Sequence, residues 1–135
     1  MSYWTFLADP ETYGWSELQH AGRTVWDGIA NATALRHLRS CRPGDRVLIY
    51  HTAPDKAVMG VAEVVGEPRP DPAADGRVVV DVIPVQALAR PLPLAELKRD
   101  PVLGDLAFVK MPRVAVQPVT PEQWSKVLQL SGTGG

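Results

Sequence analysis

Runs of β-branched and aromatic residues predict most of the strands. Tyr3–Leu7 is rich in such residues and ends at Asp9-Pro10, a combination typical of a strand followed by a turn. Arg46–His51 is a further, mostly apolar run of the same kind. Ala57–Val65 is predicted to be its hairpin partner, with Gly60 as a bulge or a point of close backbone approach.

Two later segments continue this pattern. Val78–Leu88 has strand character, although Pro84 implies an edge strand or a bulge, and Val114–Val119 is a further strand stopped at Pro118. The polar, proline-rich stretch 68–76, which precedes both, is predicted to be a surface loop.

Apolar positions at helical spacing and capping residues predict the helices. Asn31 is a suitable N-cap for a helix that runs to about Arg39, with Ala34, Leu35 and Leu38 as its buried stripe. Shorter helical segments are predicted at Ser16–Leu18, at Leu94–Lys98 and at Glu122–Leu130 behind Pro121. About five or six strands with two or three helices in this order predict an α+β domain built on a curled sheet.

Length and composition are those of one globular domain. Of the 135 residues, 45% are hydrophobic and 21% are charged, and we expect a single domain over residues 1–131 with a flexible tail at 132–135. The sequence shows no apolar run of the roughly 20 residues that a membrane helix needs and no signal-peptide pattern. One cysteine, Cys41, excludes an internal disulfide, and the three histidines are too scattered for a metal site. We expect a cytoplasmic protein with no metal and no cofactor.

The charge pattern bears on nucleic-acid binding. A net charge of −1 argues against a general polyanion binder, because such proteins are strongly basic. Basic residues nevertheless gather in one short stretch, which contains Arg36, His37, Arg39, Arg42 and Arg46. A local basic patch can bind phosphates, and the alternative is a solvated helix face.

The segment Val25–Asn31 carries the most specific chemistry. Trp26 supplies a broad π-face, Gly28 lets the backbone turn tightly, and Asp27 and Asn31 can hydrogen-bond a planar heterocycle. These residues together are suited to grip a flat ring such as a nucleobase. The alternative is a core tryptophan beside a helix cap.

Several motifs in a fixed order resemble the EVE domain family. They are Tyr3-Trp4-x-Phe6 with Asp9-Pro10, Trp26-Asp27-Gly28-Ile29-x-Asn31, Gly44-Asp45-x-Val47-Leu48-x-Tyr50-His51, Gly60-Val61-Ala62-Glu63-Val64, Pro72, and Arg113-Val114-x-Val116-Gln117-Pro118-Val119. The family belongs to the PUA-like superfamily, together with YTH and ASCH domains. The resemblance therefore implies a small curled β-barrel of about five to six strands, flanked by short helices. It also implies a non-enzymatic reader of modified bases in DNA or RNA, with an aromatic-lined pocket for one extruded base.

The chain departs from the family pattern at four positions. Leu7 and Ala8 stand where the family commonly has Lys and Ser, so a positive charge and a hydroxyl are missing. Ala30 and Ala32 stand where the family often has Arg and an aromatic residue. The walls of the implied pocket are therefore retained and its rim is altered, so the ligand preference of relatives does not transfer directly.

Further candidates have structural alternatives of comparable weight. Tyr50 and His51 end a strand, where alternation lets at most one of them line a pocket, and the alternative for His51 is a hydrogen bond to the backbone. Arg113 suits phosphate binding with Arg36 and Arg39, and its alternative is a buried salt bridge. Tyr13 and Trp15 either form a second wall of the pocket or pack on the barrel. Trp124, Phe108 and Met59 are predicted to be packing residues.

The sequence leads to one main hypothesis and two alternatives. We expect a nucleic-acid-binding module in which Trp26 stacks on a flipped, modified base while Asp27 and Asn31 bind its edge. A sensor of a free nucleoside-like molecule is the first alternative, favoured by the near-neutral charge. Hydrolysis of a modified nucleoside by His51 and Asp27 is the weaker alternative, because the sequence has no nucleophile elbow, deaminase pattern or phosphate-binding glycine loop.

Overall fold

The computed structural model describes residues 1–134, which form seven strands and five α-helices. The strands are β1 (Tyr3–Ala8), β2 (Thr24–Trp26), β3 (Arg46–His51), β4 (Ala57–Val64), β5 (Arg69–Pro70), β6 (Val78–Pro93) and β7 (Val116–Val119). The helices are α1 (Trp15–Ala21), α2 (Ala32–Ser40), α3 (Leu94–Arg99), α4 (Ala107–Lys110) and α5 (Pro121–Ser131), and a 3-10 turn, η1, spans Leu103–Asp105.

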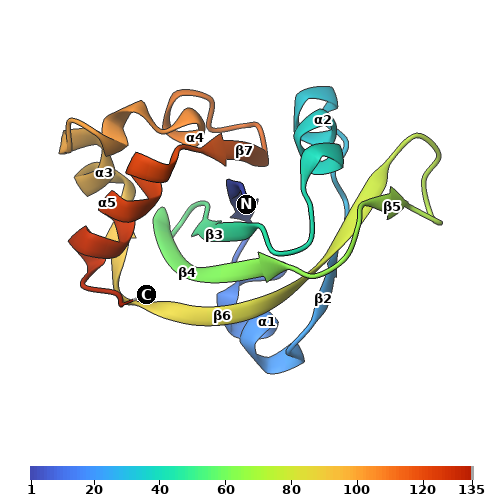
Figure 1. The fold of residues 1–135 in the computed structure, drawn as a ribbon, viewed down its shortest axis with the longest axis horizontal. Helices are drawn as coiled ribbons and strands as arrows, with labels where there is room; N and C mark the ends of the chain where they lie inside the picture. Colours follow the sequence, from blue (N-terminus) through green and yellow to red (C-terminus); the bar gives the residue numbers. More distant parts are fainter. Residues whose placement is uncertain (135) are drawn as a thin grey trace.

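The strands form one curled sheet in the order β2-β6-β4-β3-β1-β7, and β5 pairs with the start of β6. Neighbouring strands are antiparallel except β1 and β3, which are parallel. The long β6 bends across the molecule and pairs first with β2 and then with β4 (Figure 1). Within residues 1–134 the edge strands β2 and β7 do not pair, so the sheet is a half-barrel with an open seam. The predicted α+β fold with a small curled barrel is confirmed.

Local signals in the sequence predicted the central elements correctly. β3 has the predicted bounds, and its hairpin partner β4 ends one residue before the predicted boundary. Asn31 is the N-cap of α2, where its side chain accepts a hydrogen bond from the backbone amide of Ala34 at 3.0 Å. α5 begins at Pro121, behind a capping box of Thr120 and Gln123.

Several parts of the chain differ from the prediction. The short strand β5 lies within the stretch 68–76 that was predicted to be a loop, and β7 begins at Val116 and not at Val114. β2 was not predicted, because a three-residue edge strand has too few alternating positions to give a pattern. β6 continues past Leu88 to Pro93, because irregularities in its pairing with β4 let the two strands stay together; Pro84 lies at one of them, opposite Ala62. α4 was also missed, because four residues are too few to show helical spacing.

The tail predicted at 132–135 is bound to the sheet in its described part. Thr133 Oγ1 accepts a hydrogen bond from the amide of Ala89 at 3.0 Å, and the carbonyl of Gly134 accepts one from Gln86 Nε2 at 2.8 Å. These contacts hold the chain end against β6. Gly135 lies outside the described residues.

Side chains on the two faces of the sheet form two hydrophobic clusters. β3 is buried on both faces, since Val47 and Ile49 enter one cluster and Leu48 and Tyr50 the other. This double burial explains its nearly continuous apolar run. The first cluster is covered by α1 and α2, and the second by the C-terminal helices α3, α4 and α5, which gather on one side of the molecule (Figure 1).

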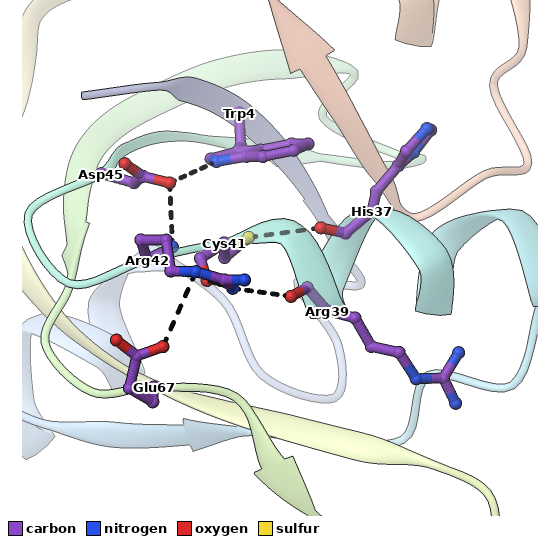
Figure 2. A network of polar contacts seen from close by, with 7 residues as sticks. All are labelled: Trp4, His37, Arg39, Cys41, Arg42, Asp45 and Glu67. Carbon is purple, nitrogen blue, oxygen red and sulfur yellow. Dashed lines mark hydrogen bonds and ion pairs between the residues drawn. The ribbon is translucent and has the colours of Figure 1, made fainter.

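The buried carboxylate of Asp45 ties the start of the chain to the turn between α2 and β3 (Figure 2). It accepts hydrogen bonds from the amide of Ser2 at 2.9 Å, from Trp4 Nε1 at 3.0 Å and from the amide of Arg42 at 3.0 Å. These three hydrogen bonds stabilise the negative charge of the buried Asp45 carboxylate. The contact fixes β1 beside β3, where β1 forms part of the cavity described below.

Gly60 lies where α1 packs against the sheet. A Cβ atom at residue 60 would lie 2.4 Å from Trp15 Cζ2, and the pairing of β4 with β6 is irregular between Val58 and Gly60. Both features predicted for this glycine, a bulge and a close approach, are therefore present. The indole of Trp15 occupies the space that a side chain would need.

Candidate functional site

A cavity of about 670 Å³ opens where the half-barrel fails to close. It is lined by Leu7, Ala8, Asp9, Thr12, Tyr13, Thr24, Val25, Trp26, Asp27, Gly28, Ile29 and Ala115. These residues come from the end of β1 and the turn after it, from β2 and the turn after it, and from the residue before β7. The volume lies within the range of roughly 300–1,000 Å³ typical of small-molecule sites.

Trp26 is the aromatic wall of this cavity. Its side chain is only 8% exposed and belongs to the first hydrophobic cluster. Phe6 packs against it with ring centroids 5.4 Å apart, and Tyr13 meets it edge-on at 6.5 Å. Trp26 is thus both a core residue and a wall of the cavity. The contacts with Phe6 and Tyr13 hold the ring in place.

Asp27 and Gly28 continue the wall after Trp26. Gly28 has a φ of 76°, a left-handed conformation that glycine adopts without strain and that turns the chain toward α2. Asp27 is exposed, and within residues 1–134 its carboxylate has no hydrogen-bond partner. The carboxylate is therefore free to accept hydrogen bonds from a ligand.

A second wall of the cavity is the turn after β1. The carboxylate of Asp9 accepts hydrogen bonds from the amide of Glu11 at 3.0 Å and from the hydroxyl of Thr12 at 3.1 Å, which fixes the turn. The hydroxyl groups of Tyr13 and Thr24 share a hydrogen bond that joins this wall to β2. Tyr13 is thus a cavity residue, whereas Trp15 packs against Gly60.

Three of the predicted ligand contacts do not line the cavity. The amide oxygen of Asn31 is used by the cap of α2, which keeps it at the helix start. Tyr50 is buried in the second cluster, 4.6 Å from the ring of Phe108, because alternation along β3 turns it to the other face. His51 is 6% exposed, and both ring nitrogens have partners, Trp15 and Asp55.

The basic residues do not form a single patch. Arg46 pairs with Glu63 at 3.3 Å, and Arg42 turns toward Glu67 and the carbonyl of Arg39 (Figure 2). Arg39 itself donates to the carbonyl of Gly76 at 2.8 Å. Arg39, Arg42 and Arg46 are therefore bound to different parts of the surface and do not act as one basic patch.

Two arginines remain open to solvent beside the seam. Arg36 is exposed on α2, and α2 packs along β7, where His37 Nδ1 lies 2.7 Å from the carbonyl of Val116. Arg113 is also exposed, two residues before Ala115 of the cavity wall, and so it is not the buried salt bridge of the alternative. Within residues 1–134 neither side chain forms an ion pair.

Several lining residues had no signal in the sequence. Thr12, Thr24 and Ala115 are ordinary residues whose role depends on which segments meet at the seam. Leu7 and Ala8 did carry a signal, because they are the positions at which the chain departs from the family pattern. The apolar character of this corner follows from those departures.

Two further properties of the described residues bear on function. Within residues 1–134, three or more His, Cys, Asp or Glu side chains are nowhere grouped so that they could hold a metal ion. Over the same part of the chain, the helices are all too short or too polar to span a membrane.

Comparison with protein families agrees with the fold and the motifs. The model of the EVE domain matches residues 2–130, nearly the whole chain. The chain belongs to the EVE domain family. This confirms the resemblance of the sequence motifs. Human thymocyte nuclear protein 1 is 27% identical to this EVE domain over an alignment of 166 positions, gaps included, which covers 96% of the chain and 73% of the human protein.

Solved structures show the same architecture. A protein of Rhodopseudomonas palustris, determined by NMR, is 34% identical, with a TM-score of 0.93 over 98% of this chain and 94% of its own. The human THYN1 protein, in complex with DNA that contains 5-methylcytosine, is 24% identical, with a TM-score of 0.89 over 100% of both chains. At that identity the second likeness is one of fold.

Proposed function

We propose that this EVE domain is a non-enzymatic DNA-binding module that accepts one flipped, modified base in the cavity beside Trp26. The observation that carries the proposal is the cavity itself: an aromatic wall, a free carboxylate and a tight glycine turn line a space of ligand size at the seam of the barrel. The DNA complex of human THYN1, a protein of the same fold, supports the choice of a modified-DNA ligand.

Trp26 would supply most of the affinity for the base. Stacking a base on an aromatic ring contributes about 1–3 kcal/mol. Phe6 and Tyr13 already hold the ring, so little side-chain entropy is lost on binding. Asp27 would accept a hydrogen bond from an exocyclic amine, a group that cytosine and adenine carry and thymine lacks.

The exposed arginines would contact the DNA backbone outside the cavity. Arg113 and Arg36 lie beside the seam, and Arg39 on the same helix is a further contact if it exchanges its bond to Gly76. With only a few phosphates neutralised, we expect a shallow dependence on salt. The logarithm of the affinity should fall with that of the salt concentration with a slope of about −0.9 per phosphate contact.

Discrimination between a methylated and a plain base should be modest. A buried methyl group contributes about 0.8 kcal/mol, which is roughly a fourfold change in affinity. The apolar corner at Leu7 and Ala8 is suited to such a group. A preference of more than about 100-fold for a lone methyl would contradict this simple picture of the cavity.

Binding to short duplexes with one 5-methylcytosine tests the proposal by fluorescence anisotropy. Trp26→Phe keeps an aromatic ring and should bind several-fold more weakly, and Trp26→Ala should lose about 1–3 kcal/mol of binding free energy. Asp27→Asn should weaken binding, whereas Asp75→Asn, an exposed carboxylate in the loop between β5 and β6, is the matched control. Unchanged affinity in a folded Trp26→Ala protein would rule out this cavity as the base site.

A second candidate function is the binding of a free nucleoside-like molecule. The charge of the cavity lining favours this function. Among the described residues, the lining contains the carboxylates of Asp9 and Asp27 and no lysine or arginine. A salt titration separates the two functions, because a neutral ligand should bind almost independently of salt. Hydrolysis by His51 with Asp27 is not supported, because both nitrogens of His51 are bound elsewhere.

A further inference from the structure

His51 joins three segments of the chain from a nearly buried position at the end of β3. Its Nε2 lies 2.9 Å from the backbone nitrogen of Trp15, at the start of α1, and its Nδ1 lies 2.9 Å from Asp55 Oδ2. Only 6% of the residue is exposed. The imidazole therefore connects the β3–β4 turn to the segment that follows the cavity wall.

These two contacts fix the protonation state of the ring. A backbone N–H can only donate, so Nε2 must accept and must carry no proton. The ring proton is then on Nδ1, from which it is donated to the carboxylate of Asp55. The structure therefore assigns His51 as the neutral Nδ1–H tautomer.

The start of α1 depends on this acceptor. The amide of Trp15 donates to His51, and the amide of Gly14 donates to Glu17 Oε1 at 2.6 Å, so two free N–H groups of the helix start are satisfied by side chains. A Cβ atom on Gly14 would lie 2.9 Å from His51 Nε2 and 3.2 Å from Glu17 Oε1. The imidazole and the carboxylate thus converge on the same glycine.

Proton uptake by His51 would break this arrangement. A second ring proton, on Nε2, would point at the amide of Trp15, which is also a donor. The charged group in contact with the ring is Asp55, with Lys56 next to it on the exposed turn and Glu17 at the neighbouring Gly14; the strand partners Ala8 and Ala57 carry no charge. The two donors would repel each other, so the start of α1, including the adjacent amide of Gly14, would move away from the ring.

The affected segment is continuous with the cavity. Gly14 and Trp15 directly follow Thr12 and Tyr13, which line it, and the edge of Tyr13 packs against Trp26. His51 is also the register partner of Ala8, at the end of the other lining strand. Release of the start of α1 therefore loosens one wall of the cavity.

We propose that neutral His51 is a positioning residue for the cavity wall, and that its protonation releases the amides of Gly14 and Trp15 and weakens ligand binding. The loss of affinity rests on the proposed DNA-binding function, whereas the release of the two amides does not. An unperturbed histidine changes its charge between about pH 5 and pH 8, and this sets the pH range of the experiments.

Amide hydrogen exchange and imidazole ¹⁵N spectra of the free protein test the release. Between about pH 8 and pH 5.5 the amides of Gly14 and Trp15 should lose protection, after correction for the intrinsic exchange rates, while the amide of Ala34 at the start of α2 should keep it. At the higher pH the ring of His51 should show an unprotonated Nε2. A protonated Nε2 at that pH, or unchanged protection at the lower pH with the ring charged, would overturn the proposal.

Affinity for the 5-methylcytosine duplex tests the link to the cavity. The wild type should bind roughly fivefold more weakly at about pH 5.5 than at about pH 8, the factor that corresponds to about 1 kcal/mol for one net hydrogen bond. His51→Gln offers an acceptor that does not titrate and should remove this pH dependence, and His51→Ala should bind weakly at both pH values. His20→Gln, at the exposed end of α1, is the matched control and should behave as wild type.

The outcomes separate the two proposals. Wild-type protein that binds no DNA at the higher pH contradicts the proposed function, and the exchange experiment then decides the role of His51 alone. Binding at the higher pH with the same pH dependence in wild type and His51→Gln contradicts the role of His51 and leaves the proposed function intact.

Discussion

Gly60→Ala tests how α1 is packed against the sheet. The added methyl group would lie 2.4 Å from Trp15 Cζ2 and 2.6 Å from Cε2 and Cη2, well inside van der Waals contact. The indole has little room to withdraw, because Trp15 is 5% exposed and lies within the first hydrophobic cluster. We therefore expect the substitution to force the ring or the helix to move.

The expected loss of stability is about 2 kcal/mol. Overpacking of a core typically costs about 1–3 kcal/mol, and this contact lies in the upper part of that range because the ring is rigid. Replacing a glycine in a strand otherwise gains about 0.5–1 kcal/mol, which offsets part of the loss. For a domain of this size, about 2 kcal/mol corresponds to a decrease of roughly 6–10 °C in Tm.

Urea unfolding followed by fluorescence measures this effect. Gly66→Ala is the control, because a Cβ atom there would meet only Asp81 Oδ2 at 3.8 Å, an ordinary contact. In a Trp15→Phe background the methyl group has space, so Gly60→Ala should then cost less than about 0.5 kcal/mol, with the difference appearing as coupling between the two sites. Equal midpoints for Gly60→Ala and Gly66→Ala would refute the reasoning, as would a cost of Gly60→Ala that stays the same in the Trp15→Phe background.

Three further predictions concern the rest of the fold. Asp45→Asn places an amide donor among backbone and indole donors and should cost about 1–3 kcal/mol in urea unfolding, while Asp75→Asn should be neutral. A hydrogen bond from the amide of Leu103 lowers the pKa of Asp100 in the folded protein. The ionised carboxylate of Asp100 therefore stabilises the fold above about pH 4, and this stabilisation is lost as the pH falls through the lowered pKa of the folded state. Asp100→Asn should flatten that part of the curve of unfolding free energy against pH. Burial raises the pKa of Cys41 to about 12, so a thiol reagent at about pH 8 should label the unfolded protein and spare the native one, and rapid native labelling would contradict this burial.

The sequence predicted those elements whose signals lie within one short segment. The cap at Asn31 and the proline at residue 121 act on the backbone of the helix that they begin, and neither needs a distant partner. The continuous apolar run of Arg46–His51 likewise identified a strand buried on both faces. β2 escaped prediction because its pairing with the start of β6, far along the chain, defines it more than its own three residues do.

The candidate site was predictable only in part. Trp26, Asp27 and Gly28 were identified because an aromatic ring, a carboxylate and a glycine stand together in the sequence, and the structure places all three on the cavity. His51 was predicted as a ligand contact because it ends a strand. Its side chain instead forms the hydrogen bond to the backbone that was the alternative. The donor is the amide of Trp15, a partner 36 residues away that nothing near His51 in the sequence indicates.

The amino-acid sequence was sufficient to predict the family, the α+β class and the local elements, because capping, turn and alternation signals act between residues that are close along the chain. Which residues share the cavity depends on how distant segments pack together. Within residues 1–134, β2 and β7 are the two edges of a sheet that does not close. The ends of β1 and β2 and the residue before β7 meet there through pairings between distant segments. The cavity is a consequence of that incomplete closure, which no single segment encodes.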